Sequence, residues 1–477
     1  MGSSEYDVIV IGAGPVGENV ADRAVQGGLS AVLVEAELVG GECSYWACMP
    51  SKALLRSGAA LRAAQAVDGA KQAITGTLDV AAVLARRDRM VHDWNDDSQV
   101  TWVDKAGIDL VRGHGALAGE KRVRVTADDG AVTDLVARHA VVVCTGSAAL
   151  LPDIPGLRGI QPWTSREATA AQTAPESLAI LGGGVVATEM ATAYASFGTR
   201  VTVLARSGLL TNEEPFAGEL VAASLRDLGA DVRTGVTISS ARRDGESPAR
   251  LELSDGTTLE AEEVLVATGR VPRTGDLGLE TVGLEPGSWL DVDDTLLVRG
   301  TDWLYAAGDV NHRALLTHQG KYQARAAGDV IVARATGAPV QDAPWEAHVA
   351  TADHAAVPQV TFTDPEVASV GLTAARAEKA GIRTRVIDYD LSWVAGASEW
   401  SDDYRGQARA VVDEDRGVLV GVTFVGPSVA ELLHSATIAI VGEVPLHRLW
   451  HAVPSYPTVS EVWLRFLETY GRDSASH

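Results

Sequence analysis

Two glycine-rich loops, each placed between an apolar strand and a helical stretch, constrain the fold of this chain more than any other feature. The first loop, Gly12-Ala13-Gly14-Pro15-Val16-Gly17, follows the apolar run 6–11 and precedes a second strand at 31–35. The second loop, Gly182-Gly183-Gly184-Val185-Val186-Ala187, lies between strands at 178–181 and 200–205. Such loops allow a tight turn, and the helix that follows directs its N-terminus at a pyrophosphate. We therefore predict two βαβ units that bind two dinucleotides; the alternative is two glycine-rich packing turns. The predicted binding positions in these loops are Gly12, Gly14, Gly17, Gly182, Gly184 and Ala187.

The residue at the end of the second strand differs between the two units. Glu35 follows Gly17 by eighteen residues, and an acid there accepts hydrogen bonds from ribose hydroxyls. The same spacing after Ala187 reaches Ala205, followed by Arg206. A guanidinium at this point pairs with a 2′-phosphate. We therefore favour NADPH over NADH at the second site, while a simply solvated Arg206 is the alternative.

A cysteine pair, Cys43 and Cys48, lies in the run 40–52 just downstream of the first loop. Two such thiols beside a flavin exchange two electrons with it, and the thiolate is the reactive form. The residues after Cys48 predict a helix, and helix N-termini lower the pKa of a thiol. The alternative is a structural pair. Cys144 lies in an apolar strand and is predicted to be a core residue.

Bulk properties exclude several classes of protein. The formal net charge of -23 argues against nucleic acid and anionic membrane surfaces as partners. No apolar run approaches the roughly 18 residues that a membrane span requires, and the chain shows no signal peptide. Three cysteines do not make a secreted disulfide scaffold. We expect a cytoplasmic enzyme with one redox pair.

Composition shifts along the chain predict an α/β protein of three domains. Residues 1–150 are predicted to form the first part of one Rossmann-like dinucleotide-binding domain, and 151–272 a second. The family resemblance described below implies that the first is the FAD-binding domain and the second the NAD(P)-binding domain. Residues 273–346 return to the first domain. Residues 347–477 alternate strands and helices without a nucleotide fingerprint, which predicts a separate α+β domain. Between the two loops, residues 56–111 are predicted to be mostly helical.

The order of these motifs resembles that of the pyridine nucleotide-disulfide oxidoreductases, the group that includes glutathione reductase, dihydrolipoamide dehydrogenase and mercuric reductase. The redox run, both glycine loops, Ala267-Thr268-Gly269-Arg270 and Ala307-Gly308-Asp309 occur in family order over nearly the whole chain. The resemblance implies FAD at the first site, with Asp309 on its ribityl or pyrophosphate part, and a C-terminal dimerisation domain. The other cofactor-binding positions that it implies are Gly41, Thr145, Gly146, Gly269 and Gly308.

The resemblance also implies roles for the redox residues. Cys48 would face the flavin as the charge-transfer thiolate, and Cys43 would be the interchange thiol that meets the substrate. Lys52 would lie near flavin N5 and pair with Glu189. A helix beginning near Thr317-His318 would direct its positive end at the flavin, with His318 a helix position and not a catalytic one. A homodimer would complete each active site from the other chain.

The chain departs from the family at its C-terminal motif. Disulfide reductases of the family have His-Pro-Thr and a following Glu, and the histidine moves the proton in thiol exchange. Here Tyr456 replaces the histidine, while Glu461 remains. A phenol titrates near 10 and an imidazole near 6.5, so Tyr456 donates a hydrogen bond but is a poor base. His447 or His451 would have to substitute as the base.

Two further departures concern the acceptor. Mercuric reductases also place a tyrosine at this point but carry a C-terminal cysteine pair, which the printed chain lacks, so we do not expect efficient mercury reduction. Glu42 stands where the family usually has threonine, and its charge would oppose thiolate formation at Cys43. Four aromatic residues either line a pocket for a bulky acceptor or pack in a core or interface: Tyr45, Trp46, Trp393 and Trp400.

Three functions remain from these observations. The first is an FAD enzyme that passes a hydride from NAD(P)H through flavin to the Cys43–Cys48 disulfide and then to a small disulfide-type acceptor. The second is a flavin reductase or diaphorase that reduces a quinone, metal or other acceptor directly and does not use the family's His-Glu base. The third is an FAD-binding scaffold or redox-sensing partner without turnover.

Overall fold

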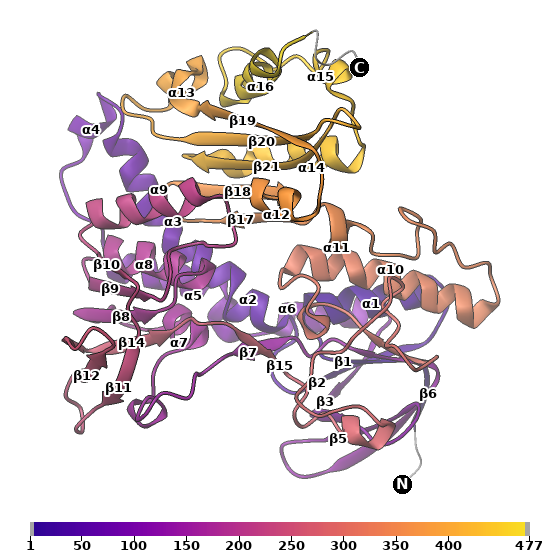
Figure 1. The fold of residues 1–477 in the computed structure, drawn as a ribbon. Coiled ribbons are helices and arrows are strands. Elements are labelled where there is room, and N and C mark those ends of the chain that lie inside the picture. The colour runs from indigo at the N-terminus through magenta and orange to yellow at the C-terminus, as the bar shows by residue number, and fades with distance from the viewer. Residues whose placement is uncertain (1–3, 473–477) are drawn as a thin grey trace. The chain divides into compact units, whose positions relative to one another are not determined.

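The computed structural model describes residues 4–472, which form two compact units (Figure 1). One unit contains the described residues up to Pro50, with Asp88–Leu150 and Gly269–His354. The other contains Ser51–Arg87, Leu151–Thr268 and the described residues from Ala355 on. The C-terminal tail that lacks cysteine lies mostly outside the described residues. The domain boundaries given above stay a prediction.

The first unit is built on a seven-stranded sheet with the order β3-β2-β1-β6-β5-β4, in which β16 also pairs with β6. The neighbours of β1 are parallel to it, whereas β4, β5 and β6 pair in antiparallel fashion. A two-stranded ribbon of β7 and β15 belongs to the same unit. The strands are β1 (Ser4–Ile11), β2 (Ala31–Glu35), β3 (Asp109–Arg112), β4 (His114–Leu117), β5 (Arg122–Thr126), β6 (Val132–Val143), β7 (Ser147–Ala149), β15 (Arg270–Pro272) and β16 (Leu304–Ala306).

Strand β1 is apolar on both faces because it is covered on both sides. Val8 and Val10 belong to one core, which also contains residues of α1 (Pro15–Gln26) and α10 (Thr317–Thr336). Ile9 and Ile11 belong to another core, on the opposite face of the sheet. Alternate side chains of a strand point to opposite faces, so a run of apolar residues marks a buried parallel strand.

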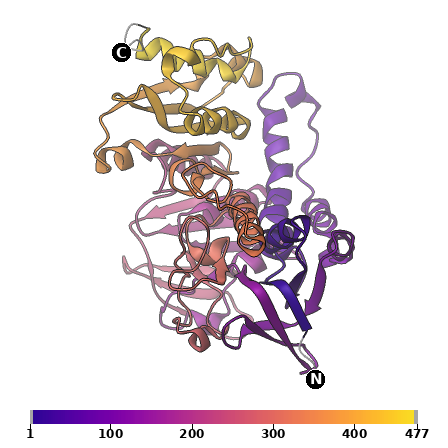
Figure 2. The ribbon, with the colours of Figure 1, turned by 90° about the vertical axis from the view of Figure 1, so that its right-hand side faces the viewer.

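Helices α1 and α10 lie side by side over the sheet (Figures 1 and 2). They approach closely at Gly328, where a Cβ atom would come within 2.5 Å of the Arg23 Cβ. Arg23 also forms an ion pair with Asp329 of α10 at 2.6 Å. The contact holds the second half of α10 against the end of α1. The other helices of this unit are α2 (Gly41–Tyr45), α6 (Asp97–Lys105) and α11 (Ala352–Ala355).

The second unit contains a parallel sheet, β10-β9-β8-β14, and an antiparallel sheet, β11-β12-β13. This is the second βαβ unit that the sequence predicts. Its helices α7, α8 and α9 follow or flank the parallel strands. The elements are α7 (Ser165–Ala170), β8 (Ser177–Leu181), α8 (Val185–Ser196), β9 (Arg200–Ala205), α9 (Pro215–Asp227), β10 (Asp231–Thr234), β11 (Ile238–Arg242), β12 (Ala249–Leu253), β13 (Thr258–Ala261) and β14 (Glu263–Val266).

The C-terminal part of this unit is a five-stranded antiparallel sheet with the order β17-β18-β21-β20-β19. Its apolar residues form one core with α14 and α16, as the predicted α+β domain requires. The elements are β17 (Pro358–Thr361), β18 (Glu366–Gly371), α12 (Ala374–Lys379), β19 (Thr384–Asp390), α13 (Ala395–Trp400), β20 (Gln407–Asp413), β21 (Val418–Gly426), α14 (Leu433–Val441), α15 (Leu446–Leu449) and α16 (Val462–Tyr470).

The stretch predicted to be helical between the loops is confirmed, except that β3 begins at Asp109. It consists of α3 (Cys48–Gln65), α4 (Ala70–Ala73), α5 (Val80–Met90) and α6. Within residues 4–472, none of these or the other helices combines the length and apolar character needed to span a bilayer.

Candidate redox and cofactor site

The first glycine loop closes on its neighbours so tightly that side chains are excluded. Gly12 has φ +101°, and a Cβ there would lie 2.5 Å from the Cys144 carbonyl oxygen. Gly41, at the start of α2, has φ +55°, and its Cβ would lie 2.8 Å from the Gly14 Cα. The dinucleotide loop and the start of the cysteine run are therefore in direct contact. Cys144 itself is buried, which raises the pKa of its thiol to about 12 and agrees with the predicted core role.

Glu35 is held in place at the end of β2. Its Oε2 accepts a hydrogen bond from the Ala13 N–H at 2.7 Å, and its Oε1 accepts one from the Glu37 N–H at 2.8 Å. Burial raises the pKa of the Glu35 carboxyl above its ordinary value. A carboxylate has capacity for about four hydrogen bonds, so ribose hydroxyls remain compatible with these contacts.

Two buried polar atoms near this loop have no hydrogen-bond partner among residues 4–472. They are Thr145 Oγ1, directly after β6, and Glu18 Oε1, in the first turn of α1. Burial raises the pKa of the Glu18 carboxyl to about 7. A buried polar atom without a partner costs about 1–3 kcal/mol, which a polar ligand removes. The residues present therefore fit FAD at the first site.

Asp309 follows β16 and belongs to a polar cluster with Ser147 and Arg270. The Ser147 hydroxyl donates to Asp309 Oδ2 at 2.5 Å, and Arg270 Nε donates to the same hydroxyl oxygen at 2.5 Å. The Arg270 guanidinium lies 3.7 Å from the Asp309 carboxylate. Segments far apart in the sequence thus hold this acid in one orientation.

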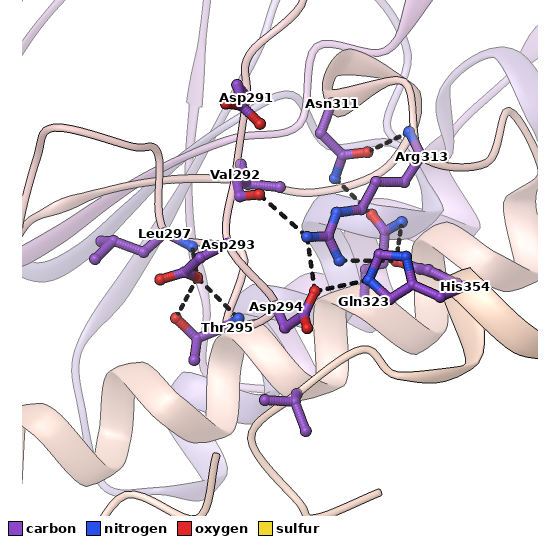
Figure 3. A network of polar contacts seen from close by, with 12 residues as sticks. Asp291, Val292, Asp293, Asp294, Thr295, Leu297, Asn311, Arg313, Gln323 and His354 are labelled. Carbon is purple, nitrogen blue, oxygen red and sulfur yellow. Dashed lines mark hydrogen bonds and ion pairs between the residues drawn. The ribbon is translucent and has the colours of Figure 1, made fainter. Parts of the chain in front are cut away.

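A second network fixes the turn that carries Asp309. Gln323 of α10 accepts hydrogen bonds from the Gly308 N–H and from the Asn311 side chain, both at 2.8 Å. It also donates to Asp353, whose side chain is fully buried and whose pKa burial raises. Figure 3 shows how Arg313 extends the network to Asp294 and the Val292 carbonyl oxygen.

The surface end of this network is a hydrogen bond between His354 and Asp294. His354 Nε2 lies 2.8 Å from Asp294 Oδ1, and this hydrogen bond holds the pKa of the Asp294 carboxyl below its ordinary value (Figure 3). The network joins the loop before β16, the Asp309 turn, α10 and α11. These contacts position the Asp309 turn and α10.

The cysteine pair lies at the start of two helices. Cys43 is in α2, and Cys48 is the first residue of α3; both are half-buried. Cys48 Sγ lies 3.3 Å from the hydroxyl oxygen of Thr317, the first residue of α10. Helix N-termini and hydroxyl donors stabilise a thiolate. The sequence predicted α10 to begin at Thr317 but gave no signal for the contact with Cys48.

Glu42, which precedes Cys43, is paired with a cation that sequence reasoning missed. Arg273 Nη2 lies 2.6 Å from Glu42 Oε1. The carboxylate that is expected to oppose thiolate formation at Cys43 therefore has a cation in contact with it, and its effect on Cys43 stays a prediction. The two residues are 231 positions apart in the sequence. The only sequence signal for this ion pair was the presence of an acidic residue in the cysteine run.

Lys52 and Glu189 are paired as predicted. Lys52 Nζ lies 2.9 Å from Glu189 Oε2 and 3.1 Å from Oε1. Glu189, on α8, is 3 % exposed and also accepts a hydrogen bond from the Phe362 N–H at 3.0 Å. The Lys52 ammonium lies 4.9 Å from the centre of the Phe362 ring. Phe362 is a third member of this cluster that sequence reasoning did not find.

The second glycine loop has the geometry of the first. Gly182 has φ +135°, Gly184 precedes α8, and Ala187 is buried within that helix. Arg206 lies directly after β9 and is exposed. In the first unit, Gly146 is in the turn before β7, and the carbonyl of Gly269 accepts a hydrogen bond from the Leu150 N–H at 2.9 Å.

The C-terminal turn differs from the predicted acid–base pair. Tyr456 is 77 % exposed, whereas Glu461 is 7 % exposed and forms its ion pair with Arg465, one helical turn further on. Within residues 4–472 the structure records no hydrogen bond between Tyr456 and Glu461. Helix α13 packs against this turn, since a Cβ at Gly396 would lie 2.1 Å from the Thr458 carbonyl carbon.

The four aromatic residues named as pocket candidates fall into different environments. Tyr45 is buried, in edge contact with Trp46, and Trp400 packs against the core of the C-terminal sheet. Core packing accounts for Tyr45 and Trp400. Trp393 is 72 % exposed and in edge contact with Tyr389.

A flavoprotein oxidoreductase with two dinucleotide-binding regions and a cysteine pair is the class that this fold and these residues define. The family model described as pyridine nucleotide-disulphide oxidoreductase matches residues 6–350, and that of its dimerisation domain matches residues 357–465. The chain belongs to the pyridine nucleotide-disulphide oxidoreductase family.

Relatives of known activity agree with this assignment. The chain is 33 % identical to the mercuric reductase of Shigella flexneri over 99 % of its own length and 82 % of that protein. It is 30 % identical to the dihydrolipoyl dehydrogenase of a Synechocystis species, covering 96 % of this chain and 97 % of that one. The solved structure of the HOCl-induced flavoprotein disulfide reductase RclA from Escherichia coli, as its Cu(II) complex, has a TM-score of 0.83 at 22 % identity, covering 98 % and 99 % of the two chains.

Family membership defines the cofactors and the class of reaction. Enzymes of this family use FAD and NAD(P)H, and this chain is an FAD-dependent NAD(P)H oxidoreductase of the disulfide reductase type. The two hypotheses in which the chain is an active enzyme are therefore favoured over the hypothesis of a flavin-binding scaffold without turnover.

Proposed function

We propose that this enzyme passes a hydride from NADPH through FAD to the Cys43–Cys48 pair, and that the pair then reduces a small disulfide-type acceptor. One observation carries the proposal: Cys48 begins α3, and its sulfur contacts Thr317 at the start of α10. Two helix N-termini at one sulfur favour the thiolate that a redox pair requires.

The residues proposed to hold FAD are Gly12, Gly14, Gly17, Glu35, Gly41, Thr145, Gly146, Gly308 and Asp309. When bound, FAD accepts two electrons as hydride and delivers them to a disulfide. Gly182, Gly184, Ala187, Arg206 and Gly269 are proposed to serve NADPH, with Arg206 on the 2′-phosphate because it is exposed directly after β9. Asp309 and Glu35 orient the bound groups, since each is fixed by two or more contacts.

Lys52 and Glu189 are proposed to act as a fixed charge pair in the flavin half-reaction. Glu189 is buried and accepts hydrogen bonds from Lys52 and Phe362, so the ammonium is held in one place. A positioned cation stabilises negative charge that develops during electron transfer, without reorganisation at the moment of reaction.

In the acceptor half-reaction the Cys43 thiolate attacks one sulfur of the acceptor disulfide. The acceptor S–S bond breaks, one thiolate leaves and takes a proton from solvent, and a mixed disulfide with Cys43 remains. The Cys48 thiolate then attacks the Cys43 sulfur, the second thiolate leaves and is protonated, and the Cys43–Cys48 disulfide forms. One NADPH and one proton thus reduce one disulfide to two thiols.

Anaerobic titration and single cysteine variants test this route. On two-electron reduction, the native enzyme should develop the long-wavelength absorption that a thiolate gives beside an oxidised flavin. Cys43→Ser should show that absorption already before reduction, because Cys48 then has no disulfide partner, but it should lose disulfide reduction by about a thousandfold or more, since no interchange thiol remains. Cys48→Ser should lose both. Native-like disulfide reduction in either variant would refute the proposal.

A second function is favoured by the C-terminal turn. Tyr456 is exposed and Glu461 is paired with Arg465, so the family's acid–base pair is not assembled within the described chain. Such an enzyme would reduce a quinone or a metal ion directly from the flavin, as a diaphorase. Quinone reduction that survives in the Cys43→Ser/Cys48→Ser double variant, with weak disulfide reduction in the native enzyme, would establish it.

The acceptor panel for these assays should contain disulfides, quinones and mercuric ion. Mercuric ion is included because relatives with about one third identity are mercuric reductases. Within residues 4–472 the structure has no cluster of three or more His, Cys, Asp or Glu side chains arranged to hold a metal. Parallel assays with NADH and NADPH, and with Arg206→Ala, test the nucleotide preference.

We further propose that the enzyme works as a homodimer in the cytoplasm. The dimerisation domain carries large exposed apolar side chains, namely Trp393, Ile438, Val441, Val453 and Tyr456. Exposed apolar groups of this kind mark interaction surfaces. Light scattering should give twice the 50.0 kDa chain mass, and fractionation of the source cells tests the compartment.

A further inference from the structure

The ion pair between Glu42 and Arg273 places a charged pair at the residue that precedes the proposed interchange cysteine. Arg273 Nη2 lies 2.6 Å from Glu42 Oε1, and Glu42 is the residue before Cys43 in the short helix α2. Neither residue has a role in the proposed route of electrons. The pair is only partly exposed, with side-chain exposures of 37 % and 27 %.

Arg273 is fixed by more than its ion pair. Its backbone N–H donates to the Gly146 carbonyl oxygen at 3.1 Å, and its Nε donates to the Ser147 carbonyl oxygen at 3.2 Å. The same Ser147 carbonyl accepts from Arg270 Nη2 at 2.7 Å. Arg273 therefore belongs to the cluster that also holds Asp309, and its guanidinium reaches from that cluster to α2.

The charge on Glu42 matters because Cys43 must be a thiolate to attack a disulfide. A nearby carboxylate disfavours a second negative charge, whereas a guanidinium in contact with it offsets this effect. The contact also ties α2, and so the position of the Cys43 sulfur, to the Asp309 cluster. Both effects act on the acceptor half-reaction and leave the flavin half-reaction unchanged.

We propose that Arg273 is a positioning residue for thiol exchange, which neutralises Glu42 and holds α2 so that Cys43 is available as the thiolate. This inference rests on the proposed function, because it assigns Cys43 the interchange role. It predicts that Glu42 and Arg273 act as a unit. Loss of the cation should be harmful only while the carboxylate remains.

The test uses the FAD-loaded enzyme after reduction with NADPH, in the native form and in four variants. They are Arg273→Gln, Glu42→Gln, the double variant Glu42→Gln/Arg273→Gln and Arg273→Lys. The rates of alkylation of Cys43 and Cys48 by iodoacetamide are followed by mass spectrometry of the peptides. Arg124→Gln is the matched control, because it removes an exposed ion pair with Asp134 in the same unit.

Arg273→Gln should lower the Cys43 alkylation rate about three- to tenfold, which corresponds to a change of about half a unit to one unit in thiol acidity. The double variant should return to within about twofold of the native rate, and Arg273→Lys should stay near it. Cys48 alkylation should not change by more than about twofold. A native rate in Arg273→Gln, or a double variant no better than Arg273→Gln, would overturn the inference.

The same experiment distinguishes a failure of the Arg273 inference from a failure of the proposed function. If native Cys43 is not alkylated after NADPH reduction, or if the native enzyme reduces no disulfide, the interchange role itself is refuted. If native Cys43 reacts and disulfides are reduced but Arg273→Gln behaves as native, only the role of the ion pair fails. The flavin absorption and unfolding temperature of each variant show that it is folded and loaded.

Discussion

The Lys52–Glu189 pair and an acid–base pair in the C-terminal motif are both features of the family, but within residues 4–472 only the first is assembled. Glu189 is buried and satisfied by Lys52 and by the Phe362 N–H. Glu461 is also buried, yet its partner is Arg465 of the following helix. Tyr456, which occupies the position of the family's base, is exposed.

This difference divides the reaction into two halves. The flavin half-reaction, which keeps the family's residues, is the retained half, and the acceptor half-reaction, in which residues differ, is the altered half. The groups that serve hydride transfer keep the family's residue types and contacts. The groups that handle the acceptor depart from the family pattern at two positions, Tyr456 and Glu42, and Glu42 is paired with Arg273. The comparison indicates that the acceptor, and the proton transfer that goes with it, is where this enzyme departs from the disulfide reductases of its family.

The largest effect is expected from the retained half. Glu189→Gln removes the charge that holds Lys52 in place, and a displacement of about 1 Å at such a site lowers a rate by about a hundredfold. We expect anaerobic stopped-flow to show flavin reduction by NADPH slowed about ten- to a hundredfold. The matched variant Glu461→Gln should stay within about twofold, and equal losses in both would contradict the division.

A gain of activity should follow when the altered half is returned to the family pattern. Tyr456→His replaces a phenol with an imidazole, the side chain that the family uses as its base, and a positioned base contributes about a hundredfold or more. Because Arg465 engages Glu461, we expect only about a tenfold rise in kcat/KM for disulfide reduction at neutral pH. Adding Arg465→Gln, which releases Glu461, should raise it further.

The control for that prediction is the rate of flavin reduction by NADPH, which neither substitution should change. If disulfide reduction does not rise in Tyr456→His or in the double variant, proton transfer is not what distinguishes this enzyme. The direct flavin reductase would then be the better description.

The fold was predictable because its determinants are local in sequence. The first glycine loop lies between an apolar strand and a helix, and the alternation of Val8, Ile9, Val10 and Ile11 between two cores follows from the period of a strand. The same reasoning located the second loop and the strand 264–266, whereas the start of α10 near Thr317-His318 was implied by the family resemblance. None of these features depends on a partner distant in the chain.

The site was predictable only where the family motif named both partners. Lys52 and Glu189 were found in this way. Arg273 and Phe362 were not, because each is identified by a contact and not by a local pattern; Glu42 and Arg273 are 231 residues apart. Arg465 was missed for a different reason: a helix brings residues four apart together, but the motif assigned Glu461 to the base.

A smaller effect is expected at Cys48, which takes part in both the flavin half-reaction and the acceptor half-reaction. Thr317→Val keeps the shape of the side chain but removes the hydroxyl that lies 3.3 Å from the Cys48 sulfur. One hydrogen bond to a charged group contributes about 1 kcal/mol or slightly more, so the thiolate population should fall about three- to tenfold. The long-wavelength absorption of the reduced enzyme measures it, with Thr317→Ser as the control that keeps the hydroxyl.

The smallest effect is expected for Tyr456→Phe, and it decides whether the tyrosine takes part in proton transfer. The phenol is exposed on its own chain and is a poor base at neutral pH, so kcat/KM for disulfide reduction should stay within about twofold of the native value. A loss of more than about tenfold, with flavin reduction unchanged, would show that the hydroxyl donates a proton to the leaving thiol. In that case the altered half contains an acid in place of the family's base, and Tyr456→His should then lower activity at high pH, where the imidazole is no longer protonated.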